Sequence, residues 1–379
     1  MENVWILGGL RSFIGVKDGI YRHIPAEVLG AQVLKEIKNR FLLKDEEIDY
    51  IIGGNAVAGG ENITRLAALT AGLDEMIPAV TLDLQCGSAL ESITAAAAKI
   101  ESGLADLVIA GGFESSSTQP VRMWNSNHPD YQEGKSYTVA KFIPDIQGEQ
   151  VMLEGAEKTA LTENVTKAEM DPWVLLSHKR AAQAAKEGIL SDIQLSIADS
   201  KKDEGIRPSM SQRLLDRLPC LLPGGSIITA ANACLMHDGA AFVVLCSEAY
   251  RKKHGLTPQA AFRFGTAIGS DPFMSPKTAV LAIRKLLKQT ALSIDEIHSL
   301  EVNEAFAVID VLLEREFPGI RERLNPLGGA LAYGHPYGAS GAIILLHLLK
   351  DLELNQGRFG ICGVAAAGGI GTALLVEKV

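Results

Sequence analysis

Short apolar runs alternate with alanine-rich helical stretches along most of the chain. The runs are rich in Val, Ile and Leu, as is typical of strands that helices cover on both faces. We predict strands at seven of them: residues 4–7, 50–52, 107–110, 241–246, 299–302, 359–364 and 373–377. The pattern therefore predicts a layered α/β fold.

Two segments of the chain resemble each other. Residues 34–55 and 283–304 each hold an amphipathic helix, a short link, an acidic turn that ends in Glu-Ile, and an apolar strand before a polar loop. The match suggests two similar halves, although two α/β segments can also match by chance. A length of 379 residues is more than one core usually supports. We expect domains at 1–256 and 257–379, with the passage between them in residues 257–265.

The alternation of strands and helices lapses between about residues 115 and 225. This stretch holds a polar, aromatic-containing segment, one well-marked helix and a charged loop. Asp171 is the expected N-cap of the helix, Pro172 its first residue and Gly188 its stop. We interpret the whole stretch as an insertion over the active-site face.

Charge and composition exclude several classes of protein. The formal net charge is −9 with acids and bases interspersed, and no Lys/Arg-rich block could follow a nucleic-acid backbone. No run of about 18 apolar residues could span a membrane, and the first apolar run fits a buried strand better than a signal peptide. A cytoplasmic protein is expected. The five cysteines are odd in number and lack C-x-x-C spacing, which argues against a disulfide framework and a metal site.

Cys86 is a candidate nucleophile. It stands where an apolar, strand-like run ends and an alanine-rich helix begins. Helix N-termini favour the thiolate and lower the thiol pKa, so a reactive cysteine is expected. The small neighbours Gly87, Ser88 and Ala89 leave room for a substrate. The alternative is a small buried core residue.

His335 and Asn303 are candidate partners. His335 lies in GGALAYGHPYGASGA, where five glycines in fifteen residues surround a His-Pro pair. Imidazole suits a general base because its pKa is near neutrality, and a structural histidine in a glycine turn is the alternative. Asn303 and Glu304 follow a predicted strand, at the sheet edge where open α/β sheets bind ligands. An amide there could hold a water or donate to an oxyanion, or it could only cap a helix.

Taken together, seven segments in this order resemble the thiolase family nearly from end to end: RSFIG, CGSALES, AGGFES, SHKRA, TAANACLMHDGAA, VNEAFA and GGALAYGHPYGASGA. The resemblance implies a duplicated αβαβα layered fold with an inserted loop domain. It also implies a homodimer or homotetramer, with coenzyme A or acyl-CoA as substrate and no covalently bound cofactor.

The resemblance implies a role for each candidate. Cys86 would be the acylated nucleophile, His335 its base, and Asn303 the holder of a water in an oxyanion hole. Arg207, Ala230 and Cys234 fall where the family contacts coenzyme A. The family more often has serine at the position of Cys234.

Two positions depart from the family pattern. Ala365 stands where thiolases carry a second cysteine, which exchanges a proton with the substrate α-carbon. Cys362 is a poor substitute, because strand alternation puts it on the opposite face about 10 Å away. Residues 271–280 replace a Met-Gly-x-Gly-Pro stretch of the acyl pocket, so substrate size is not predicted.

Three functional hypotheses remain open. The leading one is an acetyl-CoA C-acetyltransferase-like, ping-pong reaction through a Cys86 thioester. The second keeps the acyl-enzyme but passes the acyl group to another acceptor or to water. The third is a non-catalytic acyl-CoA-binding subunit, against which the retention of Cys86, His335 and Asn303 argues. Related condensing enzymes are a further alternative.

Overall fold

The computed structural model describes residues 3–57, 61–139, 141–146, 148–234 and 236–379. Nine strands follow one another across a mixed sheet in the order β4-β3-β5-β7-β1-β8-β11-β10-β9. In the first half these are β1 (Val4–Ser12), β3 (Tyr50–Gly54), β4 (Ala79–Leu82), β5 (Leu107–Ser115) and β7 (His237–Ser247). In the second half they are β8 (Ala260–Gly269), β9 (Ile297–Val302), β10 (Phe359–Ala366) and β11 (Ile370–Lys378). The short strands β2 (Gly15–Val16) and β6 (Gln194–Leu195) pair with β7 and β1.

The two halves repeat one topology. In the first, β3 runs parallel to β5, β5 antiparallel to β7, and β7 antiparallel to β1. In the second, β9 runs parallel to β10, β10 antiparallel to β11, and β11 antiparallel to β8. Antiparallel pairing of β1 with β8 joins the halves. The two similar sequence segments supply β3 and β9, the equivalent strands of the two halves.

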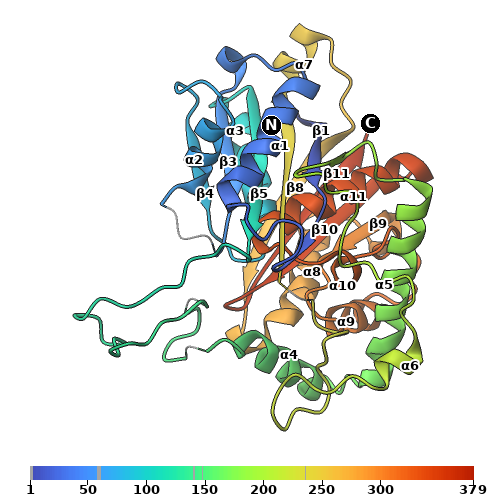
Figure 1. Ribbon diagram of the computed structural model, residues 1–379. Coiled ribbons are helices and arrows are strands. Elements are labelled where there is room, and N and C mark those ends of the chain that lie inside the picture. Colours follow the sequence, from blue (N-terminus) through green and yellow to red (C-terminus); the bar gives the residue numbers. More distant parts are fainter. Residues whose placement is uncertain (1–2, 58–60, 140, 147, 235) are drawn as a thin grey trace.

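Three hydrophobic cores separate five layers (Figure 1). The central core lies around α3 (Ser88–Glu101) and α11 (Ser340–Asn355), between the sheet halves. One outer core packs α1 (Ala26–Arg40) and α2 (Ile63–Thr70) on the first half. The other packs α8 (Thr278–Thr290) and α9 (Val308–Glu316) on the second. The expected duplicated αβαβα fold is confirmed.

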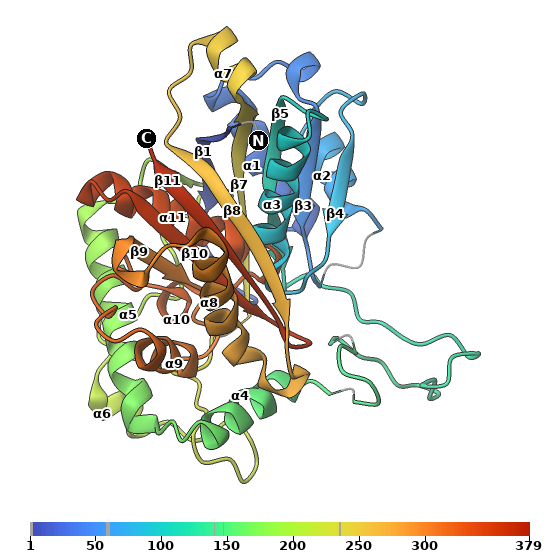
Figure 2. The same ribbon diagram turned by 180° about the vertical axis from the view of Figure 1, so that it is seen from behind.

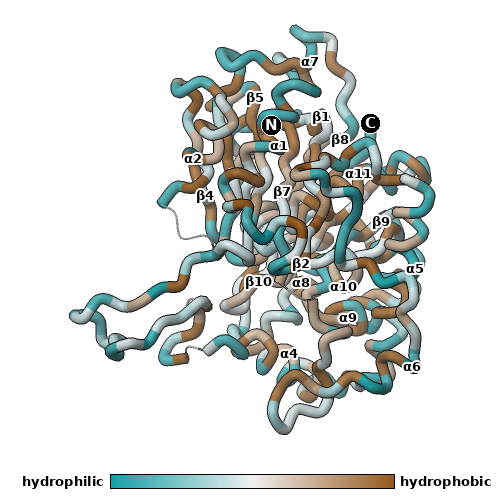
Figure 3. The backbone as a smooth tube through the Cα atoms, in the orientation of Figure 1, coloured by the Kyte–Doolittle hydropathy of each residue, from teal (hydrophilic) through white to brown (hydrophobic). Residues whose placement is uncertain are grey.

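The remaining elements are short or peripheral. The other helices are α4 (Val151–Thr162), α5 (Lys167–Glu187), α6 (Gln212–Leu215), α7 (Glu248–His254) and α10 (Ala330–Tyr333). The 3-10 turns are η1 (Asp45–Glu47), η2 (Pro272–Lys277), η3 (Ile294–Glu296) and η4 (Tyr337–Ala339). Figure 3 shows the apolar residues concentrated along the inner strands and helices, with hydrophilic residues at the outer loops. Within the described part of the chain, no helix has the length and apolar character needed to cross a membrane.

All seven predicted strands are present, and two further strands of the nine-strand order, β4 and β8, were not predicted. β4 is short and only half-buried, which gives a weak apolar signal. β8 carries Arg263, and after Phe262 only Thr266 among its residues is buried. Because β8 begins at Ala260, most of the predicted passage 257–265 is strand, and that part of the prediction is wrong. The chain instead crosses between the halves after α7.

The insertion holds more helix than expected. α4 and α6 accompany the predicted helix, α5, and residues 116–139 reach away from the body of the molecule (Figures 1 and 2). α5 begins at Lys167, so the prediction of Asp171 as its N-cap is wrong. Thr166 caps the helix in a reciprocal capping box with Glu169, a stronger start than Asp171-Pro172. Gly188 ends the helix at φ 66°, as predicted.

Candidate active site

The first turns of the two central helices touch. A Cβ atom on Gly341, in the first turn of α11, would lie 2.4 Å from the backbone nitrogen of Leu90 in α3. Only glycine permits so close an approach. Cys86 lies just before α3 and His335 shortly before α11, so this contact brings their two loops to one region at the centre of the molecule.

The loop of His335 is packed equally tightly. Gly334 has φ 109°, and a Cβ atom there would lie 2.2 Å from the ring of His237. A Cβ atom on Gly112 of β5 would lie 1.9 Å from the carbonyl oxygen of Gly338. These glycines let the loop run directly against the first sheet half. Their abundance in the motif therefore has a packing cause.

A rigid turn presents Cys86. Gln85 has the left-handed φ of 51°, and its backbone N–H donates to the Asp83 carboxylate at 2.7 Å. The backbone N–H of Leu84 donates to the Ser88 hydroxyl at 2.9 Å. The Cys86 residue is 9% exposed. The backbone amides of Ala367 and of Cys86 itself lie near enough to the sulfur to stabilise its thiolate.

Burial controls the acidity of this thiol. Desolvation raises the pKa of Cys86 to about 12, and the charges of Glu114 and Asp83 add to the rise. The two backbone amides lower the pKa, by less. The prediction of a lowered thiol pKa at the helix N-terminus is therefore wrong, because loss of solvation outweighs the amides and the helix dipole. In this site the sulfur is a neutral thiol at neutral pH.

His335 is held at both ring nitrogens. Its Nδ1 lies 2.6 Å from the Ser340 hydroxyl and its Nε2 lies 3.3 Å from Nδ2 of Asn303. The Ser340 hydroxyl can donate to the Pro336 carbonyl at 3.2 Å. It then accepts the Nδ1 proton, which leaves Nε2 to accept from the Asn303 amide. Burial, with a smaller effect of His237, lowers the pKa of His335 to about 3, so the ring is neutral.

Cys234 and Met236 connect the loop that follows Asn303 with the loop of His335. The backbone N–H of Cys234 donates to the carbonyl of Ala305 at 2.9 Å, and Met236 pairs with His335 in an isolated bridge. Cys234 also interacts electrostatically with Cys86, which adds to the burial that raises the pKa of Cys234. The structure thus brings Asn303, His335 and Cys234 together and places Cys86 within electrostatic reach of Cys234. In the described chain no hydrogen bond joins Cys86 to His335.

Arg207 and Ala230 lie apart from the sulfur. Arg207 is exposed and lines a groove of about 590 Å³ along α5, together with the basic residues Lys179 and Lys186. Its backbone N–H donates to Nδ1 of His178 at 3.1 Å, and its guanidinium donates to the Glu204 carbonyl. Ala230 is exposed in a turn outside this groove.

The C-terminal hairpin separates Ala365 from Cys362. Ala365 pairs with Gly371 and packs in the outer core of the second half. Cys362 pairs with Glu301 and packs in the central core. Its side chain is therefore on the opposite face of β10 from Ala365, as strand alternation predicts. Among the described residues, no three His, Cys, Asp or Glu side chains cluster so that they could hold a metal ion.

Sequence reasoning missed several side chains around His335. Ser340 contacts Nδ1, His237 accepts from the His335 backbone N–H at 3.2 Å, and the Tyr337 ring stands edge-on to the imidazole at 5.0 Å. Ser340 and Tyr337 belong to the motif already noted around His335. His237 comes from a distant segment, and only the folded packing of Gly334 reveals its proximity.

Comparison with known proteins identifies the chain. It matches the thiolase N-terminal domain over residues 4–249 and the thiolase C-terminal domain over residues 256–378. It is 33% identical over 401 residues to beta-ketoadipyl-CoA thiolase from Escherichia coli, covering 100% of both chains. The fold matches the crystal structure of acetyl-CoA acetyltransferase from Bacillus anthracis with a TM-score of 0.93 and 31% identity, covering 100% of this chain and 99% of that one. The human mitochondrial 3-ketoacyl-CoA thiolase in complex with CoA matches with a TM-score of 0.92 and 28% identity, at 100% and 98% coverage.

A duplicated five-layer fold with a cysteine and a histidine loop at its centre is that of an acyltransferase that works on coenzyme A thioesters. The chain belongs to the thiolase family.

Proposed function

We propose that the protein transfers acyl groups from acyl-CoA through a thioester on Cys86, in a ping-pong reaction. The observation that carries this proposal is the pair of backbone amides, of Ala367 and Cys86, that lie near the sulfur and lower the pKa of the thiol. Once the sulfur is acylated, the same amides are placed to donate to the thioester carbonyl oxygen. Preorganised donors of this kind stabilise the charge that develops on the oxygen in acyl transfer.

His335 is the proposed base. A neutral imidazole can accept the thiol proton, and burial keeps His335 neutral. Because the Cys86 thiol is also neutral, its proton leaves as the sulfur attacks the acyl carbon rather than beforehand. Nε2 of His335 has one lone pair, so the Asn303 amide, 3.3 Å away at rest, must turn from Nε2 to a water beside the reacting carbonyl when the thiol proton is transferred. Both helix N-termini favour the developing negative charge.

Coenzyme A is the proposed carrier of the acyl group. Lys179, Lys186 and Arg207 line one groove, and this concentration of positive charge suits the phosphates of the nucleotide. Cys234 lies near Cys86 and Ala230 is an exposed turn residue on the same segment, so we propose this segment as the path of the pantetheine chain. The CoA complex of the human relative supports this substrate class.

The second half-reaction depends on Ala365. Carbon–carbon bond formation or cleavage requires proton transfer at the α-carbon, and alanine has no titratable group. Acyl transfer to a different acceptor or to water is therefore a second candidate function, favoured by this one residue. Both candidates share the Cys86 thioester and differ only in what removes the acyl group.

Intact-protein mass spectrometry after incubation with acetyl-CoA tests the shared step. We expect an acetyl adduct on the unmodified protein and none on Cys86→Ala, with both proteins folded by circular dichroism. Cys86→Ala is a suitable control because it changes the volume of a small side chain only slightly. An adduct that persists on Cys86→Ala would overturn the assignment of the nucleophile.

We also propose domains at 1–256 and 257–379, a homodimer or homotetramer, and a cytoplasmic location. The matches to the thiolase N-terminal and C-terminal domains support the two domains, and the family resemblance supports the assembly. Light scattering of the purified protein would determine the assembly, and a mass of one chain would contradict it.

A further inference from the structure

The tip of the β10–β11 hairpin carries the Ala367 amide and lies against the turn that presents Cys86. Residues 367–369 form the loop between the two strands. A Cβ atom on Gly87, the residue after Cys86, would lie 3.0 Å from the methyl carbon of Thr372 in β11. The Ala367 amide lies near enough to the Cys86 sulfur to stabilise its thiolate. The position of this loop therefore determines where one of the two proposed oxyanion donors lies.

One buried serine hydroxyl holds this loop. Ser275 lies in η2, within residues 271–280, the segment that departs from the family pattern. Its hydroxyl accepts the backbone N–H of Gly369 at 3.0 Å and donates to the carbonyl of Pro272 at 2.9 Å. Because its only proton is directed at Pro272, a lone pair is left for Gly369. Ser275 is 2% exposed, so bulk water does not compete for either bond.

The backbone around this contact is closely packed. Gly369 has φ 74°, and a Cβ atom there would lie 2.4 Å from the carbonyl oxygen of Ser270. The backbone N–H of Ser270 donates to the Gly369 carbonyl at 2.7 Å. The Thr278 hydroxyl lies 2.8 Å from the carbonyl oxygen of Ile370, the first residue after the loop. The chain on both sides of Ser275 therefore contacts the hairpin tip, and Ser275 binds one of the N–H groups of the loop through its side chain.

We propose that Ser275 is a positioning residue for acyl transfer, because its hydroxyl fixes the loop that places the Ala367 amide beside the acyl carbonyl oxygen. An oxyanion donor acts only when it is held at hydrogen-bond distance from the oxygen that becomes charged. A displacement of about 1 Å can cost about 10²-fold in rate. Ser275 acts through the hairpin rather than through contact with the substrate. The inference rests on the proposed function, in which Ala367 is an oxyanion donor.

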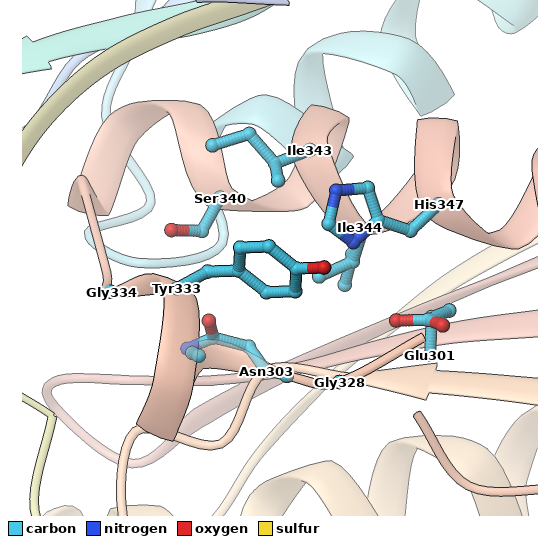
Figure 4. A pocket seen from close by; sticks show the side chains of 11 residues that line it. Glu301, Asn303, Gly328, Tyr333, Gly334, Ser340, Ile343, Ile344 and His347 are labelled. Carbon is cyan, nitrogen blue, oxygen red and sulfur yellow. The ribbon is translucent and has the colours of Figure 1, made fainter. Parts of the chain in front are cut away.

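Different residues hold the base of the site. Asn303 and Ser340 contact the two ring nitrogens of His335. Both line a small buried cavity between β9, α10 and α11 (Figure 4). Among the described residues that line this cavity, none belongs to η2 or to the loop 367–369. Loss of the Ser275 hydroxyl should therefore displace the oxyanion donor and leave the imidazole in place.

Ser275→Ala tests this role by removing the hydroxyl with little change in volume. We expect the maximal rate of acylation by acetyl-CoA to fall about 10- to 100-fold, because a misplaced oxyanion donor costs that much. The half-saturating acetyl-CoA concentration should stay within about twofold, since the groove of Arg207 is unchanged. Alkylation of Cys86 by iodoacetamide should stay within about threefold. That reaction forms no oxyanion, and Ala367 supplies only one of the two amides near the sulfur.

Ser247→Ala is the matched control. Ser247 is also buried, and its hydroxyl also accepts a backbone N–H at 3.0 Å, from Tyr250 in α7 at the edge of the molecule (Figure 1). A general loss of stability would slow acylation in Ser275→Ala and Ser247→Ala in parallel with their melting temperatures. Loss of positioning slows acylation in Ser275→Ala alone and leaves its alkylation nearly unchanged.

Hydrogen exchange separates this inference from the proposed function. The Gly369 amide should exchange slowly in the unmodified protein and faster in Ser275→Ala, as measured by mass spectrometry of the peptide that holds the hairpin loop. If the unmodified protein forms no acetyl adduct, the proposed function fails, while the exchange rates still decide whether Ser275 holds the loop. Equal exchange in the two proteins overturns that contact.

Two kinetic outcomes overturn the positioning role. One is an unchanged acylation rate in Ser275→Ala. The other is an equal loss of acylation and alkylation, which would mean that Cys86 itself has moved. If Ser275→Ala does not fold, Ser275→Cys replaces the hydroxyl by a thiol that accepts hydrogen bonds only weakly. It should show the same selective loss of acylation, and an unchanged rate in that variant would also contradict the role of Ser275.

Discussion

At the scale of single residues, burial dominates the chemistry of the site. The sequence motifs predicted Cys86, His335 and Asn303 as site residues, because unusual residues at a helix start and among glycines stand out, and these roles stay predictions. Their protonation states could not be predicted in the same way. Whether a thiol next to a helix N-terminus is acidic depends on the solvent that tertiary packing removes, and the sequence around Cys86 does not report that packing.

His335→Ala tests the base. We expect acylation of Cys86 by acetyl-CoA to slow by about 10² to 10⁴, the usual effect of removing a general base. Rapid-quench mass spectrometry of the adduct measures the acylation rate, and Cys86→Ala gives the background signal. An unchanged rate would make His335 a structural residue.

The acidity of Cys86 gives a pH profile. A thiol with a pKa of about 12 is almost entirely protonated at neutral pH. An ordinary cysteine is half ionised at about pH 8.5, whereas the thiolate fraction of Cys86 should still rise about tenfold per pH unit above that pH. Iodoacetamide alkylation of Cys86, followed by peptide mass spectrometry between pH 7 and 10, should therefore increase without reaching a plateau. A plateau near pH 8 would contradict the burial argument.

His335 also links stability to acid. Its pKa of about 3 in the folded protein lies below the unfolded value of about 6.5. A group whose pKa is depressed by folding contributes stability above the unfolded pKa, and that contribution is lost as the pH falls toward the folded pKa. We expect the urea unfolding free energy of the unmodified protein to fall between about pH 6.5 and 3, and to fall less steeply in His335→Gln. Parallel curves would show that His335 is not buried as a neutral ring.

At the scale of secondary-structure elements, apolar runs predicted seven strands, but local signals misplaced some ends. The capping box of Thr166 and Glu169 was present in the sequence and outweighs the Asp171-Pro172 start. β8 is different, because its mixed pattern becomes a central strand only through pairing with β1 and β11. Pairing partners are tertiary information, so no local pattern could have identified that strand with confidence.

The contact between α3 and α11 can be tested at one atom. Gly341→Ala would place a methyl carbon about 2.4 Å from the Leu90 backbone nitrogen, so the helices must separate. Overpacking of this kind costs about 1 to 3 kcal/mol, and acylation should slow because the Cys86 and His335 loops move apart. Gly269→Ala is the matched control, since a Cβ atom there meets nothing within 4 Å. Equal melting temperatures for the two variants would contradict the close approach.

At the scale of the whole molecule, the residues of the candidate site come from both halves, which face each other across the central core. The first half supplies Cys86, and the second supplies His335, Asn303 and the amide of Ala367. The weak similarity between residues 34–55 and 283–304 therefore reflects more than a shared local motif. It predicted the equivalence of the halves, although the glycine contacts that join α3 to α11 required the structure.

Cleavage of acetoacetyl-CoA tests the role of position 365. Thioester formation uses groups from both halves that are all retained, whereas chemistry at the α-carbon also needs an acid/base at position 365, on the hairpin of the second half. Loss of such a group costs about 10² to 10⁴ in rate, so cleavage of acetoacetyl-CoA should be weak while Cys86 acylation remains. Ala365→Cys should raise cleavage, measured by loss of acetoacetyl-CoA absorbance, and leave the acylation rate within about twofold. Cys362→Ala is the control, because Cys362 packs in the central core on the opposite face of β10 and its loss should not change cleavage. Cleavage by the unmodified protein at an ordinary turnover of about 1 to 10³ per second would mean that another group moves the α-proton, and a fall in Cys362→Ala would identify that group.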